Sequence, residues 1–254
     1  FLIFYIFTLL GNKTIIVLSH LDPHLHNPMY FFFSNLSFLD LCYTTGIVPQ
    51  LLVNLRGADK SISYGGCVVQ LYISLGLGST ECVLLGVMAF DRYAAVCRPL
   101  HYTVVMHPCL YVLMASTSWV IGFANSLLQT VLILLLTLCG RNKLEHFLCE
   151  VPPLLKLACV DTTMNESELF FVSVIILLVP VALIIFSYSQ IVRAVVRIKS
   201  ATGQRKVFGT CGSHLTVVIL FYGTIIYIYM KPQNTISQDE GKFFTLLHNH
   251  HTQP

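Results

Sequence analysis

Charged side chains are scarce in this sequence of 254 residues, of which only 11% are Asp, Glu, Lys or Arg. A soluble globular domain usually carries about a quarter charged residues, so the composition excludes an ordinary soluble domain. The formal net charge is only +3 and the basic residues are scattered, which argues against a nucleic-acid-binding protein. Hydrophobic residues make up 55% of the chain, and this excess is typical of a membrane protein.

The sequence also lacks a methionine and a basic leader before its first apolar run, which starts at Phe1. We therefore expect no signal peptide and a true start upstream of Phe1. No internal repeat or low-complexity tract occurs, which argues against an inverted-repeat transporter. No nucleophile or set of metal ligands accompanies the apolar runs, so we expect neither an enzyme nor a transition-metal site.

Six apolar segments are long enough to cross a bilayer, which takes roughly 20 mostly apolar residues in a helix. Short polar connections with Pro or Gly join several of them. We therefore predict a single all-α membrane bundle over residues 1–254, rather than separate domains. The predicted spanning helices are Phe1–Leu18, Met29–Val53, Cys67–Phe90, Cys109–Leu138, Leu169–Val192 and Val207–Met230.

The most distinctive stretch runs from Met88 to Tyr102 and reads MAFDRYAAVCRPLHY. It places Asp91 beside Arg92 at the end of the third apolar run, where a charged pair is less costly than in hydrocarbon. The residues alone are compatible with a membrane-edge ion pair or with a conformational switch. The whole string resembles the end of the third helix in olfactory receptors, a branch of the rhodopsin-like G-protein-coupled receptors.

The resemblance extends from about residue 3 to Leu246, in matching order and spacing. Besides the stretch above, it rests on Gly11–Asn12, Leu25–Asp40 (LHNPMYFFFSNLSFLD), Ser187–Tyr188, Lys206–Leu215 (KVFGTCGSHL) and Phe221–Gly223. The outer loop and the string NPMY are similar to the large tetrapod-type class. After Leu246 the match stops, and residues 243–254 are too few and too polar to span a bilayer. We interpret residues 243–254 as an aberrant remnant of helix seven.

Cysteine, rather than basic charge, orients the predicted bundle, because basic residues divide evenly between its two faces. Helix parity places Cys67, Cys139, Cys149 and Cys159 on one face. Four thiols there suggest an oxidising compartment with two disulfides, free thiols being the alternative, and four cysteines allow three pairings. The resemblance implies the pairs Cys67–Cys149 and Cys139–Cys159, with this face outside the cell. Asn165 is then a candidate glycosylation site.

The resemblance implies how the chain would signal. Arg92 paired with Asp91 would hold the inactive state; once released, it would meet Tyr188 and a heterotrimeric G protein on the inner face. The expected switch residues are Asp91, Arg92, Tyr93 and Tyr188. His214, on the sixth predicted helix, is interpreted as a buried histidine with its hydrogen bonds satisfied or as a pH-sensitive contact.

The resemblance places an odorant pocket in the outer half of the bundle, between the third, fifth and sixth helices. Such pockets are mostly apolar with a few placed polar groups. The candidates are selected by helical spacing from Arg92 and Pro180. We expect about half of them to contact the ligand and the others only to pack against neighbouring helices. The candidates are Ser74, Leu75, Gly78, Ser79, Val172, Ile176, Tyr222, Ile225, Ile226 and Tyr229.

Asp40 and Glu81 are the two carboxyl groups placed deep inside predicted apolar spans. Charged groups at that depth usually face the bundle and need a partner. Matching acids in the resembled family line a small polar cavity that can hold sodium, and a cation would relieve repulsion between two carboxylates. We therefore predict a weak sodium site, with two protonated, hydrogen-bonded acids as the alternative.

Together these features predict a multi-pass receptor of the cell membrane. It would bind a small volatile odorant, contact membrane lipid and signal to a heterotrimeric G protein in the sense of smell. The missing seventh span supports an alternative, in which the chain is a non-signalling truncated receptor or pseudogene product that associates with other membrane receptors.

Overall fold

The computed structural model describes residues 2–23, 26–56, 64–136, 163–197 and 200–230. Within these ranges the regular structure is helical, as predicted. The long helices are α1 (Leu2–Leu21), α2 (Pro28–Arg56), α3 (Tyr64–Cys97), α5 (Pro108–Leu134), α7 (Thr163–Val196) and α8 (Ala201–Met230), and two short elements, η2 (Pro99–His101) and α4 (Tyr102–Val105), follow α3.

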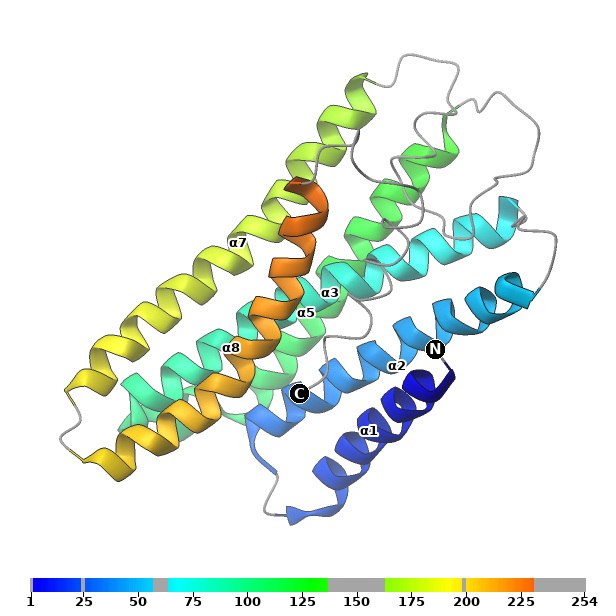
Figure 1. Ribbon diagram of the computed structural model, residues 1–254. Helices are drawn as coiled ribbons and strands as arrows, with labels where there is room; N and C mark the ends of the chain where they lie inside the picture. The colour runs from blue at the N-terminus through cyan, green and yellow to red at the C-terminus, as the bar shows by residue number, and fades with distance from the viewer. Residues whose placement is uncertain (1, 24–25, 57–63, 137–162, 198–199, 231–254) are drawn as a thin grey trace.

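The long helices lie side by side in one bundle, with α3 at its centre (Figure 1). α3 packs against α2, α5, α7 and α8, and α1 packs against α2. Successive helices run in opposite directions, so the bundle has two ends. The Arg92 end holds the last turns of α1, α3 and α7 and the first turns of α2, α5 and α8. The Cys67 end is the opposite one.

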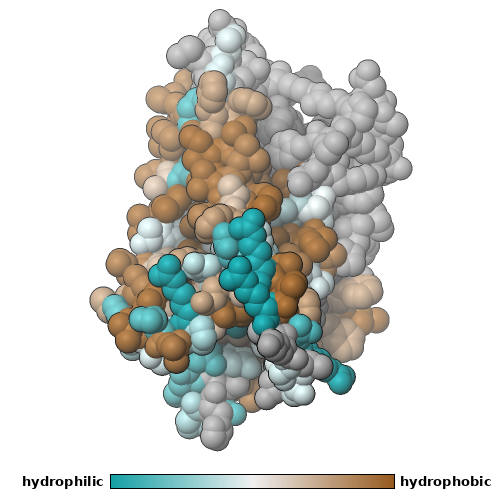
Figure 2. Space-filling model, turned by 90° about the vertical axis from the view of Figure 1, so that its left-hand side faces the viewer, coloured by the Kyte–Doolittle hydropathy of each residue, from teal (hydrophilic) through white to brown (hydrophobic). Residues whose placement is uncertain are grey.

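All six predicted spans are present as helices long and apolar enough to cross a membrane. Their outer faces carry large apolar side chains, and on α7 the rings of Phe170, Phe171 and Phe186 are each more than half exposed. In Figure 2 apolar side chains dominate the upper half of the face shown, whereas polar ones gather in its lower half. In water such an exposed surface would promote aggregation, so it fits a bundle surrounded by lipid.

Two helix boundaries differ from the prediction in ways that matter for function. α3 continues seven residues beyond Phe90, so Asp91 and Arg92 lie inside the helix rather than at its end. The helix stops at Cys97 because Arg98 precedes Pro99, and a residue before proline disfavours the helical conformation. α7 begins at Thr163, six residues before the predicted start, which places Asn165 in its first turn.

The interior is built mainly from α2, α3 and α8, with Ala115 of α5 and Ile184 of α7, and the most extensive helix contact is between α3 and α5. Phe32, Leu39, Leu84, Leu85 and Phe221 are among the almost completely buried side chains of this core. In lipid, helices associate through close packing and hydrogen bonds rather than through the hydrophobic effect. Small residues on α5, such as Gly122 and Ser126, allow this approach, and the Ser126 hydroxyl donates a hydrogen bond to the Tyr72 carbonyl oxygen on α3.

Candidate functional site

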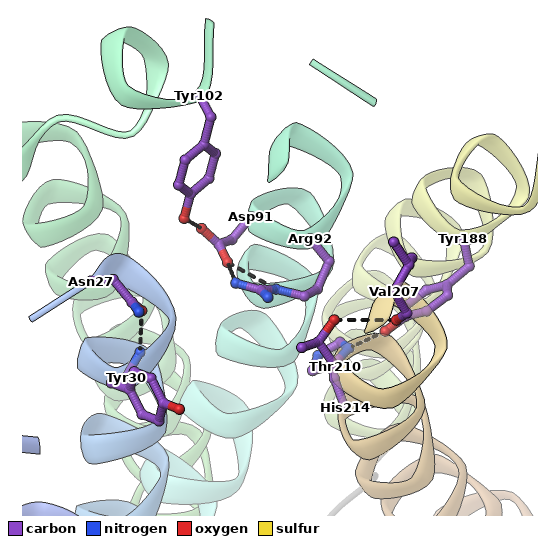
Figure 3. A network of polar contacts seen from close by, with 9 residues as sticks. All are labelled: Asn27, Tyr30, Asp91, Arg92, Tyr102, Tyr188, Val207, Thr210 and His214. Atoms are coloured by element: carbon purple, nitrogen blue, oxygen red, sulfur yellow. Dashed lines mark hydrogen bonds and ion pairs between the residues drawn. The ribbon is translucent and has the colours of Figure 1, made fainter. Parts of the chain in front are cut away.

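Asp91 and Arg92 form a buried ion pair near the end of α3, with exposed fractions of only 1% and 9% (Figure 3). Arg92 Nε donates a hydrogen bond of 3.0 Å to Asp91 Oδ2, and Arg92 Nη2 donates to the same oxygen. The Tyr102 hydroxyl donates to the other oxygen, Oδ1, at 2.8 Å. Asp91 therefore holds both the guanidinium of its own helix and a tyrosine from the following segment.

Tyr102 reaches Asp91 because the chain turns back after α3. Pro99 begins the short helix η2, α4 follows directly, and Tyr102 is its first residue, eleven positions beyond Asp91. Burial, and then the neighbouring Asp91 carboxylate, raise the pKa of Tyr102. The hydroxyl therefore remains a protonated donor throughout the physiological pH range. Tyr102 is the last residue of the stretch Met88–Tyr102 that resembles olfactory receptors, but no local sequence pattern indicates its contact with Asp91.

A second polar pair joins α7 to α8 beside the first (Figure 3). The Tyr188 hydroxyl donates to the Cys211 carbonyl oxygen at 3.1 Å and lies 2.8 Å from His214 Nδ1. When the Tyr188 hydroxyl donates its proton to the Cys211 carbonyl oxygen, the hydrogen in the contact between Tyr188 and His214 must be carried by His214 Nδ1. The two rings stack with an angle of 5° between their planes. Tyr188 is thus held by α8, while Arg92 is held by Asp91.

The predicted switch residues do not all meet. Asp91 and Arg92 are paired, Tyr188 lies in the neighbouring pair, and Tyr93 points elsewhere. The Tyr93 ring lies between Phe90 and Phe186, at centroid distances of 6.3 and 6.5 Å. Tyr93 therefore packs between α3 and α7 instead of joining the polar network.

A pocket opens at the Arg92 end between α2, α3 and α8. Its walls combine apolar side chains of α2 and α3 with polar side chains of α3 and α8. It is lined by Met29, Phe32, Phe33, Met88, Asp91, Arg92, Thr210 and His214. The sequence did not indicate this pocket, because its lining comes from three distant stretches with no shared pattern.

The predicted odorant residues lie in the half of the bundle toward the Cys67 end, and the described side chains among them do not share one face. Tyr222 lies in the main core, and the side chains of Ile176 and Ile225 pack against it. The Tyr222 hydroxyl donates a hydrogen bond of 3.1 Å to the Cys82 carbonyl oxygen on α3. Gly78 lies one turn from Cys82 and has no neighbouring atom within 4 Å of where a Cβ would stand. Space is therefore available beside Gly78.

Other predicted odorant residues are arranged differently. Ser79 is buried toward α5, where its hydroxyl oxygen accepts a hydrogen bond of 2.8 Å from Asn125 Nδ2. Ser74, Leu75 and Val172 are half-buried. The side chains of Ile226 and Tyr229 lie outside the described residues.

Asp40 and Glu81 are both buried, on α2 and α3, and the Asp40 carboxyl group acts electrostatically on Glu81. Glu81 Oε1 is buried and has no hydrogen-bond partner among the residues described. An orphaned carboxyl oxygen near a second carboxyl group is the donor set that a hard cation such as sodium prefers. The arrangement is compatible with a cation, and also with the alternative of two protonated acids, because burial opposes the charged form of a carboxyl group.

The predicted disulfides fall largely on residues outside the described ranges. Cys67, buried at the first turns of α3, is disulfide-bonded. Its partner is not among the other described cysteines, because all of these are free. Cys139, Cys149 and Cys159 lie in residues 137–162, so the pairings Cys67–Cys149 and Cys139–Cys159 stay predictions.

Comparison with known proteins gives a consistent result. A family model described as olfactory receptor matches residues 1–237. The human olfactory receptor 2B2 is 61% identical over 97% of this chain and 69% of its own length. The human olfactory receptor 2G3 is 60% identical over 97% of the chain and 80% of its own length, and the mouse olfactory receptor 2B6 is 57% identical over 98% and 79%.

Proposed function

The chain belongs to the olfactory receptor family, and from this premise we propose that it binds a small volatile molecule and signals to a heterotrimeric G protein. It is a multi-pass membrane receptor rather than an enzyme. The observation that carries the proposal is the Asp91–Arg92–Tyr102 network, which lies beside a small pocket at one end of the bundle. The relatives do not favour the alternative of a non-signalling associate.

In the proposed mechanism Arg92 is a two-state element. In one state the Asp91 carboxylate holds its guanidinium; in the other, Arg92 is free to meet a G protein at the Arg92 end, which faces the cytoplasm. A ligand shifts such an equilibrium only if it binds one state more tightly than the other. The small pocket beside Arg92 supports this role only in placing Arg92 at the end of the bundle, together with Asp91 and His214.

The proposed odorant site lies in the outer half, around Gly78, Ile176, Tyr222 and Ile225. α8 packs less extensively than the other long helices within the described residues. It is also tied to α3 by the Tyr222 hydroxyl and to α7 by Tyr188. A molecule bound beside Gly78 would press on the α3–α8 contact at Tyr222, so it could change the position of α8 and, through His214, the surroundings of Arg92.

The proposal is tested with a cyclic AMP reporter and a panel of odorants in cells that express the chain. We expect at least one odorant class to raise cyclic AMP. Arg92→Ala should abolish the response of the receptors that reach the cell surface, although the unpaired Asp91 carboxylate should lower their amount. Asp22→Asn, which changes a charge at the same end outside the network, is the matched control. A response that survives Arg92→Ala, or silence from a chain that reaches the surface, would contradict the proposal.

We also propose that Asp40 and Glu81 bind sodium weakly, as the orphaned Glu81 oxygen supports. We expect sodium chloride to stabilise the purified protein by about 1.4 kcal/mol at ten times the dissociation constant, with potassium chloride as the control. Asp40→Asn should remove the difference between the two salts. Thermal unfolding that responds identically to sodium and potassium, in the parent and in Asp40→Asn, would refute the site.

A further inference from the structure

A partly buried carboxylate at the Cys67 end has a single weak partner among the residues that the structure describes. Glu168, in the second turn of α7, accepts hydrogen bonds from Gln129 Nε2 on α5, at 3.2 Å to Oε2 and 3.4 Å to Oε1. Gln129 itself is only 3% exposed. Across the described residues, the Asp91–Arg92 pair is the only salt bridge, so no cation faces Glu168 there.

A neutral amide is a poor match for this carboxylate. Removing an ionised carboxylate from water is expensive unless an opposite charge and hydrogen bonds compensate it. Gln129 supplies one amide group and no charge. An ammonium group supplies a positive charge and three donors, and charge-assisted hydrogen bonds are about twice as strong as neutral ones.

Polar groups continue inward from Glu168 along α5. Asn125 precedes Gln129 by four residues, so the two side chains lie on one helix face, about 6 Å apart along the axis. Asn125 Nδ2 donates to Ser79 on α3. Asn125 Oδ1 is buried and has no hydrogen-bond partner within the described part of the chain. The unfilled positions at Glu168 and Asn125 are therefore acceptors, which suit a ligand that donates.

Apolar groups run alongside on α7. Val172 and Ile176 follow Glu168 at intervals of four residues, so all three share one face of α7. Ile176 packs against the main core, and Gly78 on α3 leaves open space. A charged head at Glu168 and a short hydrocarbon tail that lies along Val172 and Ile176 would match this arrangement.

We propose that Glu168 binds the ammonium group of a small alkylamine, which takes the place of the Gln129 amide as donor, and that the alkyl tail lies along Val172 and Ile176. The inference rests on the proposed odorant-binding function and names its ligand class. It adds a subsite between α5 and α7, and it predicts a preference for amines over alcohols, aldehydes and carboxylates of equal length. Aldehydes offer no donor, and carboxylates would face Glu168 with like charge.

The test measures ligand-induced thermal stabilisation of the full chain, purified in lipid nanodiscs, with hexylamine, hexanol and hexanoate as probes. We expect hexylamine to bind the parent best. Glu168→Gln keeps the size of the side chain and removes its charge. It should therefore weaken the affinity for hexylamine by about tenfold, equivalent to about 1.4 kcal/mol of binding free energy. Hexanol affinity should change by less than about twofold, within the spread expected for a neutral contact.

Two further variants keep the test sharp. Asp22→Asn makes the same change of charge at the Arg92 end and should leave hexylamine binding unchanged. Gln129→Leu removes only the amide, and should retain the amine response, because the ammonium replaces that donor. If it instead abolishes binding of amine and alcohol alike, Glu168 is not the anchor and the proposal is overturned.

The outcomes separate the subsite from the wider function. If hexanol stabilises the parent while hexylamine does not, or if Glu168→Gln binds hexylamine as the parent does, the amine subsite is wrong and odorant binding stands. If none of the probes, nor a broader panel of volatile molecules, stabilises the folded chain, the proposed odorant-binding function fails together with the subsite.

Discussion

Gly122→Ala should leave little folded protein in the membrane. A Cβ atom at this position would stand 2.6 Å from the Thr80 backbone nitrogen and 2.8 Å from the Gly76 carbonyl oxygen, and would overlap the Thr80 hydroxyl. Two of these three atoms belong to the backbone of α3, so no side-chain rotation can relieve the overlap. α3 and α5 would have to separate along the most extensive helix contact of the bundle. We expect a loss of about 3 kcal/mol, at the upper end for overpacking.

Gly46→Ala is the matched control, because Gly46 lies within α2 and no atom lies within 4 Å of its Cβ position. Alanine favours a helix over glycine by about 1 kcal/mol, so this change should be neutral or stabilising. Thermal unfolding of purified protein and surface labelling of intact cells measure both variants. Equal behaviour of Gly122→Ala and Gly46→Ala would show that α3 and α5 do not approach as closely as described.

Asp91→Asn should raise signalling in the absence of ligand. The asparagine can still accept a hydrogen bond from Tyr102, but it no longer holds a positive charge. Arg92, 9% exposed, is then left as a buried charge without its counter-ion, which strongly destabilises the paired state. A shift of about 2 kcal/mol toward the released state corresponds to roughly a thirtyfold rise in its population while that state is rare.

Ligand-independent nucleotide exchange on a purified G protein, with the receptor in nanodiscs, measures this effect. Tyr102→Phe provides a graded comparison: it removes one hydrogen bond to Asp91 and keeps the ion pair, so a smaller rise is expected. Exchange that is unchanged in Asp91→Asn, although the variant folds and binds the G protein, would contradict a restraining role for the carboxylate.

The spanning helices could be predicted from sequence because each rests on a local property, a run of apolar residues of sufficient length. The end of α3 could not, since hydrophobicity falls at Asp91 while the helix continues to Cys97. The structure explains the difference: the two charges satisfy each other and Tyr102, so they do not force the chain out of the helix. The short helices η2 and α4 were missed because they show no periodicity.

The candidate site was predictable where its members are neighbours in sequence, as Asp91 and Arg92 are. Partners brought together by folding were not. Tyr188 and His214 are 26 residues apart on different helices, and their contact shows only in three dimensions. Likewise, helical spacing placed Ser79 among the odorant residues, whereas packing turns its hydroxyl toward Asn125 on α5. Spacing defines a face of one helix but not which neighbour that face meets.

The orientation of the bundle is the claim on which the proposed mechanism depends most directly. Cys109 lies at the Arg92 end, at the start of α5, and is the one exposed free cysteine among the described residues. We predict that a membrane-impermeant maleimide leaves Cys109 unlabelled in intact cells and labels it after permeabilisation, as mapped by peptide mass spectrometry. Labelling of Cys109 in intact cells would place Arg92 outside, away from any G protein, and would contradict the mechanism.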